Sequence, residues 1–249
     1  MLNIKEIKRY NRQIMIEGFG KIGQNKLKDS KVIIVGSGGL GSIISIYLAV
    51  AGIGQIGIVD HEDVDLSNLN RQILHWEKDI GRKKVDSAKE KLLGLNPGTK
   101  IEAFREKITE KNVSRLVRRF DLIVDALDNF PTRYILNHTA IKNNIPLFHG
   151  AVYGFEGRAL TIIPGKTACL RCMYRGPFQE KRVPIIGVAP AVIGSIQATE
   201  VIKYILGIGD LLTNRLLFYD GLNLKFTEFK VAKNPKCEHC GQRTENDHI

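Results

Sequence analysis

The chain has 249 residues, and with 43% hydrophobic and 25% charged residues it falls in the globular range, which excludes a mainly disordered chain. The formal net charge is +11, but basic and acidic residues are interleaved, as over 78–91 and 100–119. Such stretches are typical of solvated helix faces. The charge therefore argues against nucleic acid as the main ligand and fits a phosphate-rich cofactor or an acidic protein partner.

We expect the N-terminal region to carry no signal peptide, because residues 1–12 are charged throughout and lack an apolar core. A cytoplasmic protein is therefore expected. No Asp, Glu, Lys or Arg occurs from 32 to 59, which is long enough to cross a bilayer. Glycines interrupt this stretch, and a strand, a glycine turn and a helix fit it better, so we expect no membrane span.

From residue 31 to about 153, predicted strands and helices alternate. A helical, charged lead-in covers 1–30, and a polar loop covers 61–81. The third predicted helix is expected to begin with Thr109 as its cap. Continuous apolar strands alternating with helices are typical of a parallel sheet covered on both faces. Strands are predicted at 31–35, 55–60, 100–104, 121–126 and 146–152, and helices at 39–51, 81–95, 109–120 and 130–143.

After Gly154 the pattern changes. A strand of another direction is predicted at 157–164, a long apolar helix at 190–206, and two strands within 215–230. We therefore expect one α/β domain over 1–249, with a Rossmann-like, mixed but mainly parallel sheet and helices on both faces. Its parts are the lead-in at 1–30, a nucleotide-binding half at 31–153 and a second half at 154–249.

A glycine-rich turn, Gly36-Ser37-Gly38-Gly39-Leu40-Gly41, follows the first predicted strand. Its G-x-G-x-x-G pattern allows a tight turn, and the helix start that follows offers unpaired N–H groups to phosphate. Asp60 ends the next strand, 19 residues after Gly41, at the spacing of an acid that holds ribose hydroxyls. The pattern predicts a nucleotide or dinucleotide site formed by Gly36, Gly38, Gly39, Gly41 and Asp60.

The residues beyond Asp60 favour a nucleoside triphosphate over a dinucleotide. A triphosphate carries about four negative charges and is bound as its magnesium complex. Its site therefore needs several cationic side chains for the phosphates and a carboxylate for the metal. Arg71, Lys84 and Asp128 meet that demand, whereas an NAD site has no obvious use for them. Two simpler interpretations stay open: Lys84 as one lysine of a basic helix, and Asp128 or Asn129 as the cap of the next helix.

Four cysteines form two C-x-x-C pairs, Cys169/Cys172 and Cys237/Cys240. Disulfides are rare in cytosolic proteins, and two such pairs supply the four thiolates of a tetrahedral structural zinc site. Because many residues separate the pairs, the metal would staple two distant segments of the C-terminal half. A redox function of one pair is the alternative, but neither pair is expected to follow a strand and open a helix.

The chain resembles the MoeB/ThiF/HesA family, relatives of the ubiquitin-activating enzymes, in the order of its motifs from about residue 10 to residue 241. The resemblance implies an enzyme that binds ATP, Mg²⁺ and the C-terminal Gly-Gly tail of a ubiquitin-like sulfur-carrier protein. The tail carboxylate attacks the α-phosphate, an acyl adenylate forms and pyrophosphate leaves. The motifs are the glycine turn, Asp60, Ser67-Asn68-Leu69-Asn70-Arg71-Gln72, Gly81-Arg82-Lys83-Lys84, Asp128-Asn129 and the cysteine pairs.

The resemblance also implies roles for single residues. Asp60 holds the ribose, Arg71 and Lys84 contact the phosphates together with Asn68, and Asp128 holds magnesium. Arg12 matches an arginine that reaches into the neighbouring subunit's site, which implies a homodimer. The second half of the chain would bind the carrier and zinc. The implied catalytic groups are Arg12, Arg71, Lys84 and Asp128, and the implied nucleotide site further includes Ser67, Leu69, Asn70 and Asn129.

One departure concerns the loop before the long helix. Many members of the family carry a cysteine there, but residues 176–187 hold none. If all four cysteines bind zinc, no thiolate remains for a thioester. We therefore expect no covalent enzyme–carrier intermediate and a separate sulfur donor.

Several functions stay open at this point. The carrier and its pathway, whether in molybdopterin, thiamine or thiolation chemistry or in protein conjugation, are not identified. One alternative is an NAD-dependent oxidoreductase that uses the same glycine turn. A second is a non-catalytic, zinc-stapled binding module. A third keeps the adenylation and changes the acceptor to a peptide terminus or a tRNA base.

Overall fold

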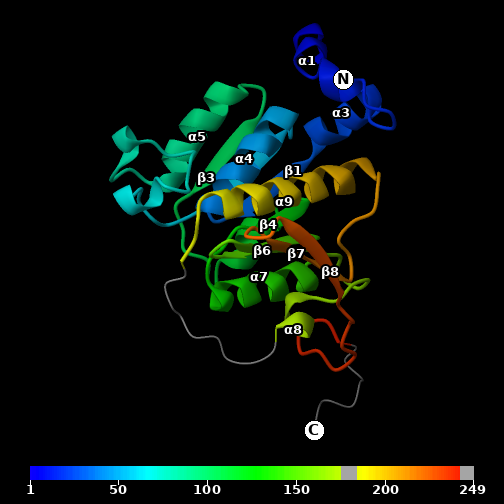
Figure 1. Ribbon diagram of the computed structural model, residues 1–249. Helices are drawn as coiled ribbons and strands as arrows, with labels where there is room; N and C mark the ends of the chain where they lie inside the picture. The colour runs from blue at the N-terminus through cyan, green and yellow to red at the C-terminus, as the bar shows by residue number, and fades with distance from the viewer. Residues whose placement is uncertain (175–183, 242–249) are drawn as a thin grey trace.

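An eight-stranded sheet forms the centre of the computed structural model, which describes residues 1–174 and 184–241 (Figure 1). The strand order is β3-β2-β1-β4-β5-β6-β7-β8, with β1 to β5 parallel and β6 to β8 antiparallel to their neighbours. The prediction of a mixed, mainly parallel sheet is confirmed. The strands are β1 Lys31–Val35, β2 Gln55–Val59, β3 Lys100–Phe104, β4 Leu122–Asp125, β5 Leu147–Tyr153, β6 Glu156–Ile162, β7 Arg215–Asp220 and β8 Lys225–Lys230.

Helices cover both faces of the sheet, and a separate hydrophobic core fills each side. Successive side chains of β1 point to opposite faces of the sheet, as in any strand. Ile34 therefore packs in one core and Ile33 in the other. On one face lie α3 (Gly20–Asp29), α4 (Gly39–Ala51), α5 (Lys84–Leu95) and α9 (Val188–Leu206), and on the other α6 (Val113–Val117), α7 (Phe130–Lys142) and α8 (Leu170–Met173).

The lead-in forms α1 (Ile4–Arg9), α2 (Asn11–Ile14) and α3. It packs at the C-terminal end of α9, where Lys26 donates to the Leu206 carbonyl at 2.9 Å. Figure 1 shows this blue segment at the top of the molecule, and α7 and α8 on the opposite side of the sheet. None of the helices in the described ranges is long and apolar enough to cross a membrane.

Two helices are shorter than the sequence predicts. The helix expected at 109–120 is α6, which begins only after Asn112, and Thr109 does not cap it. Asn112 instead accepts the Thr109 N–H at 2.8 Å and donates to the Lys107 carbonyl, so its side chain holds this stretch as a turn. The helix expected from Gly81 begins at Lys84, because Lys83 pairs in a β-bridge with Asp63.

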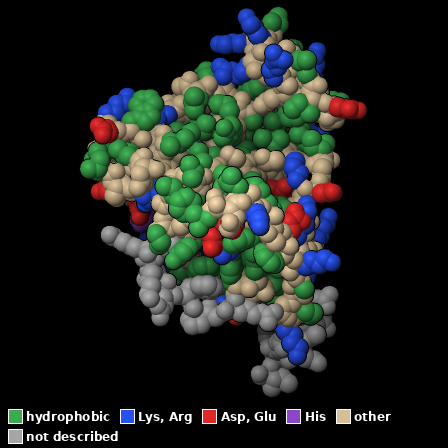
Figure 2. All heavy atoms as spheres, in the orientation of Figure 1, with side chains coloured by type: hydrophobic (Ala, Val, Ile, Leu, Met, Phe, Trp, Pro, Cys, Tyr) green, Lys and Arg blue, Asp and Glu red, His purple; other side chains and the backbone are tan. Residues whose placement is uncertain are grey.

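The polar loop after β2 contains two single 3₁₀ turns, at Leu66–Asn68 and Glu77–Asp79. On the face of the molecule in Figure 2, Lys and Arg side chains lie mostly around the rim, several of them beside Asp or Glu. Hydrophobic side chains occupy much of the middle. Among the described residues on this face, we see no continuous basic surface of the kind that a nucleic acid needs.

Candidate functional site

The glycine turn joins β1 to α4 at the carboxyl edge of the parallel strands. Gly36 has a φ of +103°, and a Cβ on it would lie 2.4 Å from the Ala126 carbonyl oxygen. A Cβ on Gly41 would lie 2.0 Å from the Gly36 carbonyl oxygen. Both positions therefore require glycine. The backbone of the turn lies directly against the end of β4, and Gly38, the residue before α4, supplies no side-chain cap to the helix.

Asp60 ties the turn to the end of β2. It lies one residue beyond the strand, and its two carboxylate oxygens accept the N–H groups of Ser37 at 2.8 Å and Glu62 at 2.9 Å. Carboxyl ends of adjacent parallel strands meet at this edge, which is where open α/β sheets bind ligands. Asp60 is thus fixed beside the glycine turn, as its spacing in the sequence suggests.

The segment from Asp65 to Gln72 borders the turn on its other side. The Arg71 guanidinium donates to the Ser67 carbonyl at 2.8 Å and to the Asn70 side chain at 2.9 Å. A Cβ on Gly39 would lie 3.4 Å from the Arg71 carbonyl oxygen, so this backbone touches the start of α4. The structure brings this motif to the glycine turn.

Lys84 is a buried cation at the first position of α5. It is only 2% exposed, and its ammonium lies 2.5 Å from the carboxylate of Glu62, which is 55% exposed. A lysine on an ordinary basic helix face would be solvated, so the simpler interpretation of Lys84 is wrong. Because Glu62 is exposed and lies just after Asp60, an anion arriving at this edge can replace it as the partner of Lys84.

Asn129, and not Asp128, caps α7. The Asn129 side chain accepts the Thr132 N–H at 3.0 Å, and the helix starts at Phe130. Asp128 is exposed, and Asn129 donates to its carboxylate at 3.2 Å. The capping alternative therefore holds for Asn129 alone, and the Asp128 carboxylate is left facing solvent just beyond β4.

A buried ionic cluster, which the sequence did not reveal, holds the loop before Asp128. Arg133 donates to the carbonyls of Leu127 and Gly150 and lies 3.4 Å from Asp125, which also accepts from His149 at 2.7 Å. Burial opposes ionisation of Asp125, but Arg133 and His149 hold the pKa of Asp125 below its usual range. Burial lowers the pKa of His149. The one signal in the sequence that could have indicated this cluster is Asp125 itself, a charged residue at the end of an apolar strand.

Buried polar atoms without partners surround the turn. The hydroxyls of Ser37 and Ser42 and the side-chain carbonyl of Gln72 are buried and have no hydrogen-bond partner among the described residues. Such atoms are rare in folded proteins and often face a bound group. Together with the uncapped start of α4, they fit a polar ligand with several phosphate oxygens.

Arg12 lies far from the turn of its own chain. It is exposed on α2, and its neighbour Gln13 donates to the Ala51 carbonyl at the C-terminal end of α4. The glycine turn lies at the other end of α4, and a helix of 13 residues is about 20 Å long. The structure therefore does not bring Arg12 to the site within one chain.

The four cysteines come together beside α8, on the face opposite α4. Their sulfur atoms all lie within 4.8 Å of one another, with 3.7 Å between Cys169 and Cys237 and 3.4 Å between Cys172 and Cys240. A tetrahedral zinc–thiolate site has sulfur atoms about 3.8 Å apart, so the cluster fits such an ion. Cys169 directly precedes α8, so this pair does open a short helix, but β6 already ends at Ile162 and the pair does not directly follow a strand.

Replacing Cys237 with serine should abolish zinc binding and lower the melting temperature by about 5–10 °C, since a structural metal contributes to folding. Zinc analysis and thermal unfolding check this, with the adjacent exposed Lys236→Ala as control. The distant glycine turn should change little at temperatures where the variant is folded, so nucleotide affinity there should stay close to that of the wild type. A wild-type protein that is stripped of metal and melts unchanged would contradict a structural role.

Comparisons with known proteins agree on one family. The sequence model of the ThiF family matches residues 10–239. The chain is 40% identical to the SAMP-activating enzyme E1 of Haloferax volcanii, covering 97% of this chain and 91% of that protein. It is also 40% identical to the sulfur carrier protein adenylyltransferase of Thermus thermophilus, covering 95% and 92%. The crystal structure of E. coli MccB with AMPCPP and selenomethionine MccA superposes with a TM-score of 0.87 at 26% identity, covering 96% of this chain and 76% of that one.

Proposed function

The chain belongs to the ThiF family, and from that premise we propose that it is an ATP-dependent adenylyltransferase that activates the C-terminal Gly-Gly carboxylate of a ubiquitin-like sulfur carrier. A carboxylate oxygen of the carrier attacks the α-phosphorus of ATP. The bond from that phosphorus to the bridging oxygen breaks, and pyrophosphate leaves. The observation that carries the proposal is Lys84, a buried ammonium held by an exposed carboxylate beside the glycine turn.

No general base is needed in this reaction, because a C-terminal carboxylate, with a pKa of about 3.5, is already ionised at neutral pH. Catalysis then consists of positioning and charge neutralisation. Asp60 would hold the ribose, and Asn68, Arg71 and Lys84 would contact the phosphates. The remaining proposed contacts with the nucleotide come from Gly36, Gly38, Gly39, Gly41, Ser67, Leu69, Asn70 and Asn129.

Magnesium fits the exposed carboxylate of Asp128. Mg²⁺ is usually bound by one or two carboxylates together with substrate phosphates, and it supplies charge neutralisation at the leaving pyrophosphate. The loop before Asp128 is held by the buried Arg133 and Asp125, so the carboxylate starts from a fixed backbone. This preorganisation supports Asp128 as the magnesium ligand.

We further propose a homodimer in which Arg12 of one subunit completes the site of the other. Support comes from the distance between α2 and the turn within one chain. Met15, Ile16 and Ile22 lie close to Arg12 in the sequence and are 67%, 54% and 77% exposed, which is typical of a surface that a partner covers. In this arrangement residues 31–153 bind the nucleotide, and residues 154–249 bind the carrier and zinc.

The alternatives make different demands on the site. An NAD-dependent oxidoreductase has no use for a buried Lys84, and the relatives named above are an adenylyltransferase and an activating enzyme. A binding module without turnover would release no pyrophosphate. Most of the loop at 176–187, which lacks a cysteine, lies outside the described residues, and the proposal of a separate sulfur donor rests on the sequence there.

Intact-mass spectrometry tests the proposed reaction. With MgATP and a Gly-Gly carrier, the enzyme should release pyrophosphate and produce carrier–AMP. No thiol-sensitive enzyme–carrier adduct should form, because the four cysteines would all be bound to zinc. If an adduct of that kind forms, the prediction that no thioester is made is wrong. If carrier–AMP forms and no adduct is found, the result supports adenylation without a covalent enzyme–carrier intermediate.

Arg71→Ala and Lys84→Ala should each lower kcat/KM by about 10- to 150-fold. Each removes one charge-assisted contact with phosphate, which contributes about 1.5–3 kcal/mol. Steady-state pyrophosphate release measures the effect, and Lys89→Ala, an exposed lysine on the same helix as Lys84, is the matched control. Either residue is excluded from the site if its variant turns over like the wild type.

A further inference from the structure

The peptide groups on both sides of the Ser37 Cα are each held by a side chain. Its N–H donates to Asp60 at 2.8 Å, and its carbonyl lies 3.1 Å from Nε2 of His75. In a trans peptide the carbonyl and the following N–H point in opposite directions. A Ser37 carbonyl held toward His75 therefore directs the Gly38 N–H away from His75. Among the described residues that N–H has no acceptor.

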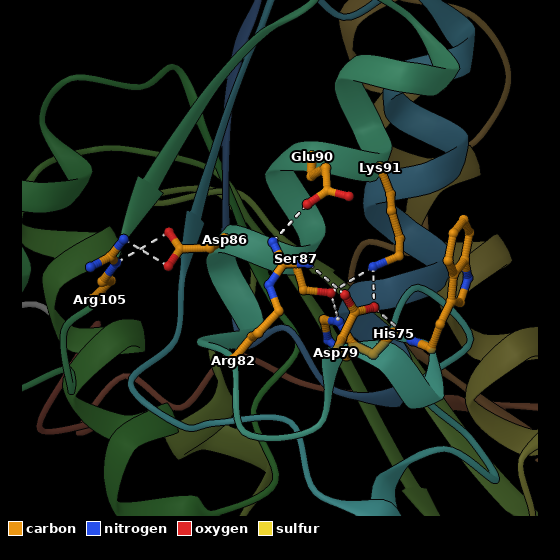
Figure 3. A network of polar contacts seen from close by, with 9 residues as sticks. His75, Asp79, Arg82, Asp86, Ser87, Glu90, Lys91 and Arg105 are labelled. Atoms are coloured by element: carbon orange, nitrogen blue, oxygen red, sulfur yellow. Dashed lines mark hydrogen bonds and ion pairs between the residues drawn. The ribbon is translucent and has the colours of Figure 1, made fainter.

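His75 is itself held by a chain of buried groups on α5 and the loop before it (Figure 3). Its Nδ1 lies 2.9 Å from the Ser87 hydroxyl, and Lys91 donates to that hydroxyl at 2.8 Å. Lys91 also contacts Asp79, which accepts the Trp76 N–H at 2.8 Å. All four of these side chains, His75, Ser87, Lys91 and Asp79, are buried.

The directions of these hydrogen bonds define one tautomer of His75. A carbonyl oxygen can only accept, so Nε2 carries the proton that is donated to Ser37. Burial lowers the pKa of His75, and the charges of Lys84 and Lys91 add to this effect, whereas the hydrogen bond to Ser37 and the charge of Asp79 oppose it; the net direction is downward, which favours the neutral ring. Nδ1 then accepts from the Ser87 hydroxyl, whose oxygen accepts from Lys91.

The ion pair at the end of this chain persists at ordinary pH. Lys91 and the backbone N–H of Trp76 outweigh the effect of burial and lower the pKa of Asp79 to about 2. Arg82 adds a second contact to Asp79 at 2.7 Å. A buried ion pair often contributes little net stability, whereas it can fix one arrangement of its neighbours.

We propose that His75 is a positioning residue for the nucleotide: held by the Asp79–Lys91–Ser87 chain, it orients the Ser37–Gly38 peptide so that the Gly38 N–H faces the phosphates. The inference rests on the proposed function, because it needs a nucleotide at the glycine turn. His75 itself touches no substrate. Its effect is to make the turn rigid before the nucleotide arrives, so that no ordering is needed on binding.

His75→Leu and His75→Gln test the proposal. Leucine removes the donor to Ser37, whereas glutamine places an N–H donor near the former Nε2. We expect the Kd for AMPCPP and the KM for ATP to rise about 10-fold in His75→Leu. In His75→Gln both should stay within about threefold of the wild type, and the KM for the carrier should stay unchanged in both variants.

Ser87→Ala and Asp86→Asn complete the experiment. Ser87→Ala should weaken AMPCPP binding about threefold, and it gives an answer if His75→Leu does not fold. Asp86→Asn breaks an exposed ion pair with Arg105 on the same helix, which is also drawn in Figure 3, and should change nothing. Calorimetry gives the Kd, and thermal unfolding shows that each variant is folded.

Two failures are distinguishable. If His75 has a purely structural role, His75→Leu and His75→Gln should both have a lower melting temperature. The KM for ATP should then be unchanged in both variants, or raised equally in both. That combination of results would overturn the inference. Equal AMPCPP affinity in the wild type, folded His75→Leu and Ser87→Ala would also overturn it. If the wild type itself neither binds AMPCPP nor releases pyrophosphate, the proposed function fails first.

Discussion

Replacing Asp128 with asparagine should lower kcat/KM by more than the 150-fold upper limit expected for Arg71→Ala or Lys84→Ala. The amide keeps the shape of the side chain and removes the anionic ligand of magnesium. The loss of activity therefore has two sources: the contact between the carboxylate and magnesium is removed, and the charge neutralisation that magnesium supplies at the leaving pyrophosphate is weakened. Because Asn129 and not Asp128 caps α7, the substitution leaves the start of the helix intact.

Pyrophosphate release over a range of Mg²⁺ concentrations measures this effect. Asp128→Asn should need much more Mg²⁺ for half-maximal activity, and its melting temperature should match the wild type. Asp210→Asn, which also neutralises one exposed carboxylate, is the control. A magnesium dependence that does not change in Asp128→Asn would count against the role of Asp128 as a metal ligand, even if activity falls.

Arg12→Ala and Asp128→Ala should each be almost inactive alone and should complement each other in one dimer. In the proposed homodimer, a heterodimer of the two variants holds one site with both wild-type residues and one site with neither. Because one of the two sites is intact, activity should recover to about half of the wild type per heterodimer. The two substitutions in the other site cost little more than one, since the effects of substitutions within one site are not additive. Two affinity tags allow the heterodimer to be purified and assayed.

A second heterodimer serves as the matched control. Arg71 and Asp128 are proposed to act in the site of the same chain, so combining Arg71→Ala with Asp128→Ala damages both sites and should restore little activity. Recovery in the first heterodimer and not in the second would assign Arg12 to the partner's site. If purified Arg12→Ala/Asp128→Ala heterodimers stay as inactive as their parents, the composite site is wrong.

The sequence was sufficient for the features that depend on local spacing. The strand at 31–35, the glycine turn and Asp60 lie close together in the chain, and regular alternation predicts the parallel sheet that brings them to one edge. The four cysteines were also predicted to meet, because few functions other than metal binding need two C-x-x-C pairs. In each case the residue types restrict the three-dimensional arrangement strongly.

The features that were missed depend on contacts between distant segments. His75 reaches Ser37 across 38 positions, and His149 reaches Asp125 across 24, so no local pattern links either pair. The burial of Lys84 depends likewise on the loop after β2, where Glu62 accepts hydrogen bonds from both the backbone N–H and the ammonium of Lys84. The helix predicted at 109–120 was too long because the Asn112 side chain forms hydrogen bonds with backbone groups that a helix would use. The hydrophobic pattern of the sequence carries no information on such side-chain hydrogen bonds.

The measurement that tests the account most directly is carrier-dependent exchange of labelled pyrophosphate into ATP. The enzyme is incubated with MgATP, labelled pyrophosphate and, in turn, each candidate carrier from the same genome. We predict label in ATP with a carrier that ends in Gly-Gly, and none without carrier, without Mg²⁺ or with the same carrier shortened by its last glycine. No exchange with any Gly-Gly carrier, from an enzyme that is folded and binds ATP, would contradict the proposed adenylation.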